Sequence, residues 1–158
     1  MRKIDALLEE YGSSHKNETN KKVHWICVPA IFWSVVALLY SIPNDHLTYV
    51  FGNGYLDNWA VVVLAVVMLY YLSLSIPLGI GMFFVSVLAI AIARSADSSE
   101  FLPLWAIALI VFIVAWIGQF WGHKIEGKKP SFLKDLQFLL IGPAWLMHFI
   151  FKKLGIRY

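Results

Sequence analysis

Charged side chains are scarce in this chain of 158 residues: Asp, Glu, Lys and Arg make up 15% of it, against roughly 25% in an average soluble domain. Hydrophobic residues make up 59% and aromatic residues 16%, and the mean hydropathy is +0.68. So few polar side chains do not suffice for a water-facing surface around a folded chain of this length. The composition therefore predicts a single integral membrane domain, residues 1–158, with lipid as its main solvent.

Other features that the sequence lacks exclude further classes of protein. The only cysteine, Cys27, leaves no pair for an internal disulfide. Residues 1–22 are charged and polar with no apolar core, which argues against a secretory signal peptide. The sequence contains no Gly-rich phosphate loop and no GxSxG, CxxC or HExxH motif. It also shows no obvious internal repeat, which weakens the case for an inverted-repeat transporter.

The basic pI, near 9.0, can suggest nucleic acid as a partner. In this chain, however, the basic residues flank the apolar segments. That placement is better explained by membrane orientation and by anionic lipid headgroups. We therefore expect the lipid bilayer, and no nucleic acid, as the partner of the positive charges.

Long apolar runs predict the membrane spans, since a span needs about 20 apolar residues. Residues 59–93 contain no charged side chain, and at about 1.5 Å per residue they are too long for one crossing of a core roughly 30 Å thick. Pro77, Gly79 and Gly81 predict a break that divides this run into two helices. The four predicted spans are residues 24–43, the two halves of 59–93, and 102–121.

A fifth apolar segment, residues 136–151, is short and contains Gly142-Pro143. We interpret it as a re-entrant or interfacial helix, because the distribution of positive charge favours that topology. With four spans and a final segment that turns back, twelve of the thirteen Lys and Arg residues face the cytoplasm and only Arg94 lies on the other side. The sequence thus predicts an all-α, polytopic helical bundle of about four spans, with cytoplasmic N- and C-termini.

This topology brings four of the five histidines to the cytoplasmic boundary: His15, His24, His123 and His148. Only His46 falls in an outer loop. A lone interfacial histidine is more often a partner for a headgroup or a backbone group, but ionisable residues gathered at a span are a typical mark of function. Neutral imidazoles together with the carboxylate of Glu126, three residues after His123, suit iron, zinc or manganese. The clustering therefore predicts a metal site, without selecting the metal.

Two polar residues are candidates to support the ligands from outside the coordination sphere. Asn20 can orient a histidine through its second ring nitrogen, although it is equally suited to a loop or a helix cap. Gln119 lies within the fourth span, one turn before His123, where lipid would penalise an unpaired amide. We interpret Cys27 as a small apolar filler and the tryptophans as interfacial aromatics, with no role in cofactor binding.

Three blocks of sequence carry a resemblance that covers nearly the whole chain: "YGSSHKNETNKKVHWICVP", "QFWGHKIEGKKPSF" and "FLLIGPAW". In order and spacing they resemble the small membrane proteins of the 2-hydroxy fatty acid dioxygenase family. The resemblance implies an iron(II)-dependent dioxygenase of fatty acid α-oxidation that uses O₂ to convert a 2-hydroxy fatty acid to the acid one carbon shorter. It implies the endoplasmic reticulum for eukaryotic relatives and the inner membrane for a bacterial one.

The same resemblance suggests which residues act. His15 and His24 match the first block, and His123 and Glu126 match the second, as iron ligands in a catalytic site. His148 stands near the last family position and completes the expected set. Two other functions remain open from the residues alone: a zinc-dependent hydrolase of membrane lipids, and a non-enzymatic scaffold or carrier whose histidines are merely interfacial.

Overall fold

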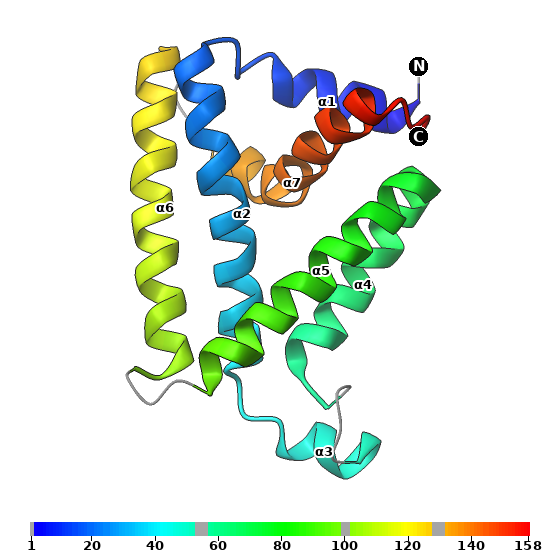
Figure 1. Ribbon diagram of the computed structural model, residues 1–158, viewed down its shortest axis with the longest axis vertical. Coiled ribbons are helices and arrows are strands. Elements are labelled where there is room, and N and C mark those ends of the chain that lie inside the picture. Colours follow the sequence, from blue (N-terminus) through cyan, green and yellow to red (C-terminus); the bar gives the residue numbers. More distant parts are fainter. Residues whose placement is uncertain (1, 53–56, 99–101, 128–131) are drawn as a thin grey trace.

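The computed structural model describes residues 2–52, 57–98, 102–127 and 132–158, with the backbone alone for 132–137. Within these residues the chain forms seven helices and no strand, which confirms the all-α prediction. Figure 1 shows α2 beside α6, α4 beside α5, and α1 beside α7 near the two termini. The helices are α1 (Lys3–Gly12), α2 (Glu18–Tyr40), α3 (Asp45–Phe51), α4 (Trp59–Leu74), α5 (Ile76–Asp97), α6 (Leu104–Glu126) and α7 (Phe132–Leu154).

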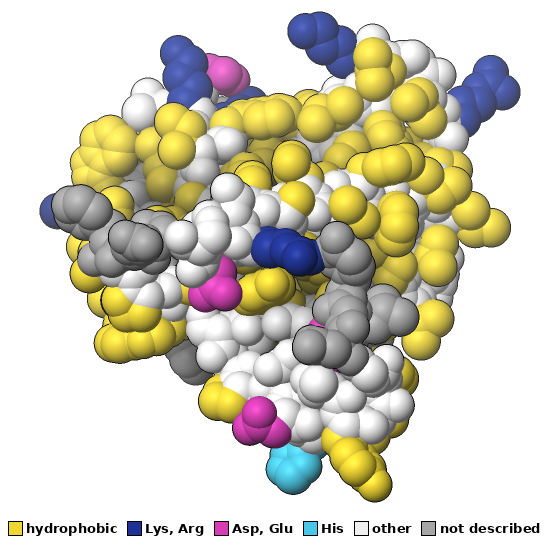
Figure 2. Space-filling view, turned by 60° about the horizontal axis from the view of Figure 1, so that its bottom comes forward, with side chains coloured by type: hydrophobic (Ala, Val, Ile, Leu, Met, Phe, Trp, Pro, Cys, Tyr) yellow, Lys and Arg dark blue, Asp and Glu magenta, His cyan; other side chains and the backbone are white. Residues whose placement is uncertain are grey.

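Three of these helices, α2, α5 and α6, are long and apolar enough to cross a membrane, and α4 is a shorter apolar helix of 16 residues. Large hydrophobic side chains on α5 and α6 point outward; Phe84 is 66% exposed and Ile117 is 63% exposed. Figure 2 shows hydrophobic side chains spread widely over one face of the molecule. Apolar surface of this extent is typical of a protein solvated by lipid.

The predicted break in the apolar run 59–93 is confirmed. Helix α4 ends at Leu74, and Ser75 has an extended backbone before α5 begins at Ile76. Pro77 lies in the first turn of α5, where its missing N–H costs no helical hydrogen bond. The Ser75 side chain accepts a hydrogen bond from the backbone N–H of Leu78, which caps the new helix.

Helices α2 and α6 extend beyond the predicted spans at the end that carries the histidines. Helix α2 begins at Glu18, because the Asn17 side chain caps it by accepting from the backbone N–H groups of Thr19 and Asn20. Helix α6 continues to Glu126 and ends at Gly127, whose φ of 73° suits a C-terminal glycine. His24 and His123 consequently lie on regular helix and not in loops.

Small residues on α6 allow it to approach α2 closely. A Cβ atom at Gly118 would lie 2.6 Å from Cys27 Sγ, and one at Gly122 would lie 2.4 Å from Asn20 Oδ1. This Gly-xxx-Gly spacing is typical of helix pairs in membranes, where close backbone approach replaces the hydrophobic drive that water would supply. The tight α2–α6 pair brings the first and the fourth predicted span together.

Helix α7 differs in detail from the interrupted segment that the sequence suggested, since it continues as one helix through Gly142 and Pro143. Gly142 is required for packing, because a Cβ atom there would lie 3.0 Å from Tyr11 Oη and 3.2 Å from Val28 Cγ1. Helix α7 is not among the candidate spans in the described part of the chain. It packs against α1, α2 and α5 at the end of the bundle where both termini lie (Figure 1).

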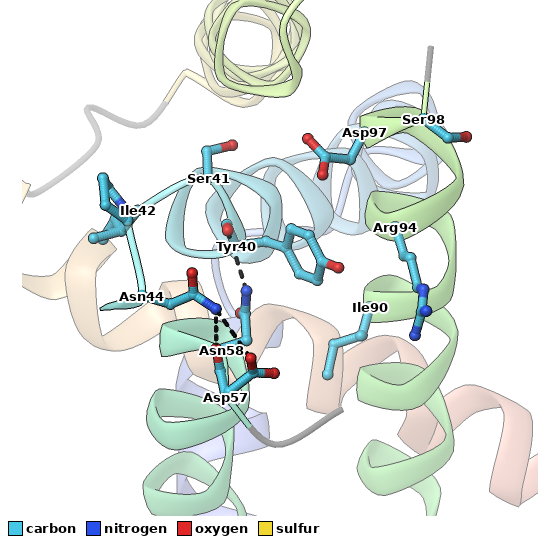
Figure 3. A pocket seen from close by; sticks show the side chains of 11 residues that line it. Tyr40, Ser41, Ile42, Asn44, Asp57, Asn58, Ile90, Arg94, Asp97 and Ser98 are labelled. Carbon is cyan, nitrogen blue, oxygen red and sulfur yellow. Dashed lines mark hydrogen bonds between the residues drawn. The ribbon is translucent and has the colours of Figure 1, made fainter. Parts of the chain in front are cut away.

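The opposite end of the bundle holds a polar pocket of about 540 Å³, where the end of α2, the start of α4 and the end of α5 meet (Figure 3). Hydrogen bonds hold several of its lining residues: Thr48 Oγ1 donates to Asp57 Oδ2 over 3.0 Å, and Asn58 Nδ2 donates to the Tyr40 carbonyl over 3.2 Å. Asn44 Nδ2 also donates to the Asp57 carbonyl. These bonds tie α3 to the start of α4, far from His15 and His24.

Candidate metal centre

Three histidines from separate parts of the chain meet at the α2–α6 pair. His15 comes from the segment between α1 and α2, His24 from α2, and His123 from α6. One ring nitrogen of each lies within 4.8 Å of the others. His15 is 2% exposed and His24 is 1% exposed, so two of the three rings are shielded from solvent.

Backbone carbonyls orient two of the rings. His15 Nδ1 lies 2.6 Å from the Tyr11 carbonyl oxygen, and His24 Nδ1 lies 2.9 Å from the Asn20 carbonyl oxygen. A carbonyl oxygen only accepts, so in each ring Nδ1 carries the hydrogen and donates it, which leaves the lone pair of the neutral ring on Nε2. This is the usual second-nitrogen arrangement of a metal-binding histidine.

The Nε2 atoms of His15 and His24 face each other over 2.8 Å, which is hydrogen-bond distance. Two acceptors at this distance repel unless a proton or a cation lies between them or beside them. The His123 ring lies close to both, with ring-centroid distances of 5.3 Å to His15 and 5.1 Å to His24. The donor set therefore fits a metal ion that accepts imidazole nitrogen.

Two aromatic residues line the site, although the sequence analysis did not single them out. The Tyr11 ring stacks on His15 with a centroid distance of 4.3 Å and an interplanar angle of 14°. Trp145, from α7, is 4% exposed and its ring lies 5.4 Å from that of His15. The only feature of the sequence that could have indicated a role for Trp145 in the site is its place after Gly142-Pro143 in "IGPAW", and a tryptophan there is equally typical of an interfacial aromatic.

Glu126 and Asn20 lie beside the histidines and secure the segment that carries His15. The Glu126 carboxylate accepts from the backbone N–H groups of Lys16 and Asn17, each over 2.9 Å, and from Asn20 Nδ2 over 3.0 Å. Glu126 is not part of the group of three within ligand distance. Its hydrogen bonds instead join the end of α6 to the start of α2.

Three further residues from the sequence analysis are His148, Gln119 and His46. His148 is outside the group of three, and its Nδ1 is hydrogen-bonded to the hydroxyl of Tyr158. Partial burial, together with the charge of Lys152, lowers the pKa of His148 below its usual range. Gln119 is 6% exposed on α6, one turn before His123. His46 is exposed on α3, at the other end of the bundle.

A comparison with protein families finds one match over residues 1–154, described as 2-hydroxy-palmitic acid dioxygenase Mpo1-like. The matched region contains all three clustered histidines as well as Glu126 and His148. No curated protein and no solved structure matches the chain. The family match thus agrees with the resemblance that the three sequence blocks carry.

Proposed function

Because the chain belongs to the Mpo1-like family of 2-hydroxy-palmitic acid dioxygenases, we propose that it is an iron(II)-dependent membrane dioxygenase that converts a 2-hydroxy fatty acid to the acid one carbon shorter. The family description supplies the dioxygenase class and the 2-hydroxy acid. The iron, the use of O₂ and the loss of the carboxyl carbon are parts of the proposal.

The observation that carries the proposal is the arrangement of His15, His24 and His123, with one nitrogen each within 4.8 Å of the others. Three imidazoles are a ligand set that iron(II) accepts and that leaves coordination positions open. A 2-hydroxy carboxylate would offer its carboxylate and hydroxyl oxygens to an ion held by these three histidines. When bound, iron(II) would supply the redox chemistry by which O₂ is activated.

The protein's own residues would orient and shield this centre. The carbonyls of Tyr11 and Asn20 fix the His15 and His24 rings with Nε2 turned toward the shared site. Glu126 would act as a positioning residue, because it holds the backbone next to His15 and does not reach the cluster. The Tyr11 and Trp145 rings exclude water from the side that they cover.

We also propose the orientation of the site in the membrane. Helices α2, α4, α5 and α6 would cross it four times, with both termini in the cytoplasm and α1 and α7 at that boundary. In a bacterium this would be the inner membrane. The carboxyl end of the substrate would then reach the histidines while its acyl chain stays in apolar surroundings.

The direct test is an assay of purified protein that was loaded with iron(II) under anaerobic conditions and then given 2-hydroxypalmitic acid and O₂. We expect O₂ consumption and formation of the fatty acid one carbon shorter, and neither with palmitic acid, which lacks the hydroxyl group. Turnover of a lipid ester or amide without O₂, supported by zinc, would favour the hydrolase instead. No turnover of either kind, with bound iron, would contradict an enzymatic role.

A further inference from the structure

Most buried polar atoms in a folded protein have a hydrogen-bond partner, so each exception requires an explanation. Among the described residues, five buried side-chain atoms have none, and two of them belong to residues that stand four positions before a clustered histidine on the same helix: Asn20 Oδ1 and Gln119 Oε1. The other three are Trp33 Nε1, Ser86 Oγ and Trp116 Nε1.

The Asn20 oxygen is accounted for by its neighbours. Asn20 Nδ2 donates to Glu126 over 3.0 Å, which fixes the orientation of the amide and turns Oδ1 the other way. There it lies against the backbone of α6, since a Cβ atom at Gly122 would be only 2.4 Å from it. A Cα–H group at such a close helix contact is a weak donor to an oxygen. Asn20 therefore needs no ligand.

Gln119 has no such explanation. Its side chain is 6% exposed, on a helix that is a candidate membrane span, and Oε1 accepts from no described donor. It lies four residues before His123, so the two side chains leave the same face of α6 about one turn apart. An unpaired amide in this setting is costly unless a ligand or a water supplies the missing partner.

We infer that Gln119 is a specificity-determining residue whose Oε1 accepts a hydrogen bond from the 2-hydroxyl group of the bound fatty acid. The inference rests on the proposed function. In the orientation that the structure gives this amide, the unpartnered atom is the oxygen, which only accepts. Its partner must therefore donate a hydrogen, and the substrate's ionised carboxylate has none to give. Of the two polar groups at the head of a 2-hydroxy acid, the hydroxyl is the one that can donate to Oε1. A fatty acid without the hydroxyl leaves Oε1 unpaired.

The test is equilibrium binding to iron(II)-loaded protein in detergent under anaerobic conditions, so that no turnover occurs. The affinities for 2-hydroxypalmitic acid and palmitic acid are measured for wild type, for Gln119→Met, which keeps the length and removes the oxygen, and for Ser86→Ala. Ser86 is the matched control, because it is also a buried and unpartnered polar residue, 5% exposed, but lies on α5. Bound iron is measured in each sample.

We expect Gln119→Met to lower the ratio of the two affinities about tenfold, with little change in the affinity for palmitic acid or in the iron content. Ser86→Ala should leave the ratio as in wild type. An unchanged ratio in Gln119→Met, as a trapped water on Oε1 would give, overturns the inference, and so does a loss of iron, which would make Gln119 a support for the ligands. Wild-type protein that binds iron but neither acid overturns the proposed function as well.

Discussion

Replacing His24 with alanine is expected to remove bound iron and to lower kcat more than about 100-fold, since residues that only orient a ligand already cost 10–100-fold when lost. His24 is 1% exposed, and its Nε2 lies 2.8 Å from that of His15, at the centre of the proposed ligand set. Its removal leaves two imidazoles for the ion. The measurement is elemental analysis together with the rate of O₂ consumption with 2-hydroxypalmitic acid.

Two other histidines serve as controls. His46→Ala changes an exposed residue on α3, at the other end of the bundle, and should keep both iron and activity. His148→Ala is more informative, because the sequence placed His148 in the ligand set and the structure pairs it with Tyr158. It should retain iron. Iron that persists in His24→Ala but is lost in His148→Ala would contradict the proposed ligand set.

Replacing Glu126 with alanine is expected to weaken iron binding about 10–100-fold, as the loss of outer-shell hydrogen bonds typically does. The Glu126 carboxylate accepts from the backbone of Lys16 and Asn17 and from Asn20 Nδ2. Without it, the backbone N–H groups of Lys16 and Asn17 lose their acceptor, and these hydrogen bonds no longer join the segment next to His15 to α6. The measurement is the concentration of an iron chelator that removes half of the metal.

Glu18→Ala is the matched control for this experiment. Glu18 is also a carboxylate near the start of α2, but its side chain pairs with Lys21, over 2.9 Å and at the surface. Exposed pairs of this kind contribute little to stability. The chelator concentration should therefore stay at the wild-type value. Equal effects of Glu18→Ala and Glu126→Ala would show that general loss of charge, and not the connection to α6, governs binding.

Hydropathy and helix-breaking residues were sufficient to predict the main helices. The break between α4 and α5 follows from a run too long for one span with Pro77 inside it. The start of α2 was missed, because Glu18 to Lys22 are polar and a hydropathy pattern assigns them to a loop. These residues are helical because the Asn17 side chain caps the helix through local hydrogen bonds, which a hydropathy pattern does not detect.

The gathering of His15, His24 and His123 could be expected from topology, since residues at the same membrane boundary are brought near one another. The directions in which the side chains point could not be predicted from the sequence. Whether His148 or Trp145 of α7 points at His15 depends on the rotation of that helix. Two side chains that are three residues apart differ in direction by about 60°, since three residues turn by about 300°. The close approach of α7 to Tyr11 at Gly142 fixes the rotation, and that contact joins distant parts of the chain.

The most direct test of the central claim is the metal content of the protein purified anaerobically in mild detergent, compared with that of His123→Ala. Near-stoichiometric iron in the wild type, absent from the variant, is the result that we predict. Zinc in both preparations, or no metal even after reconstitution with iron(II), would contradict a three-histidine iron site.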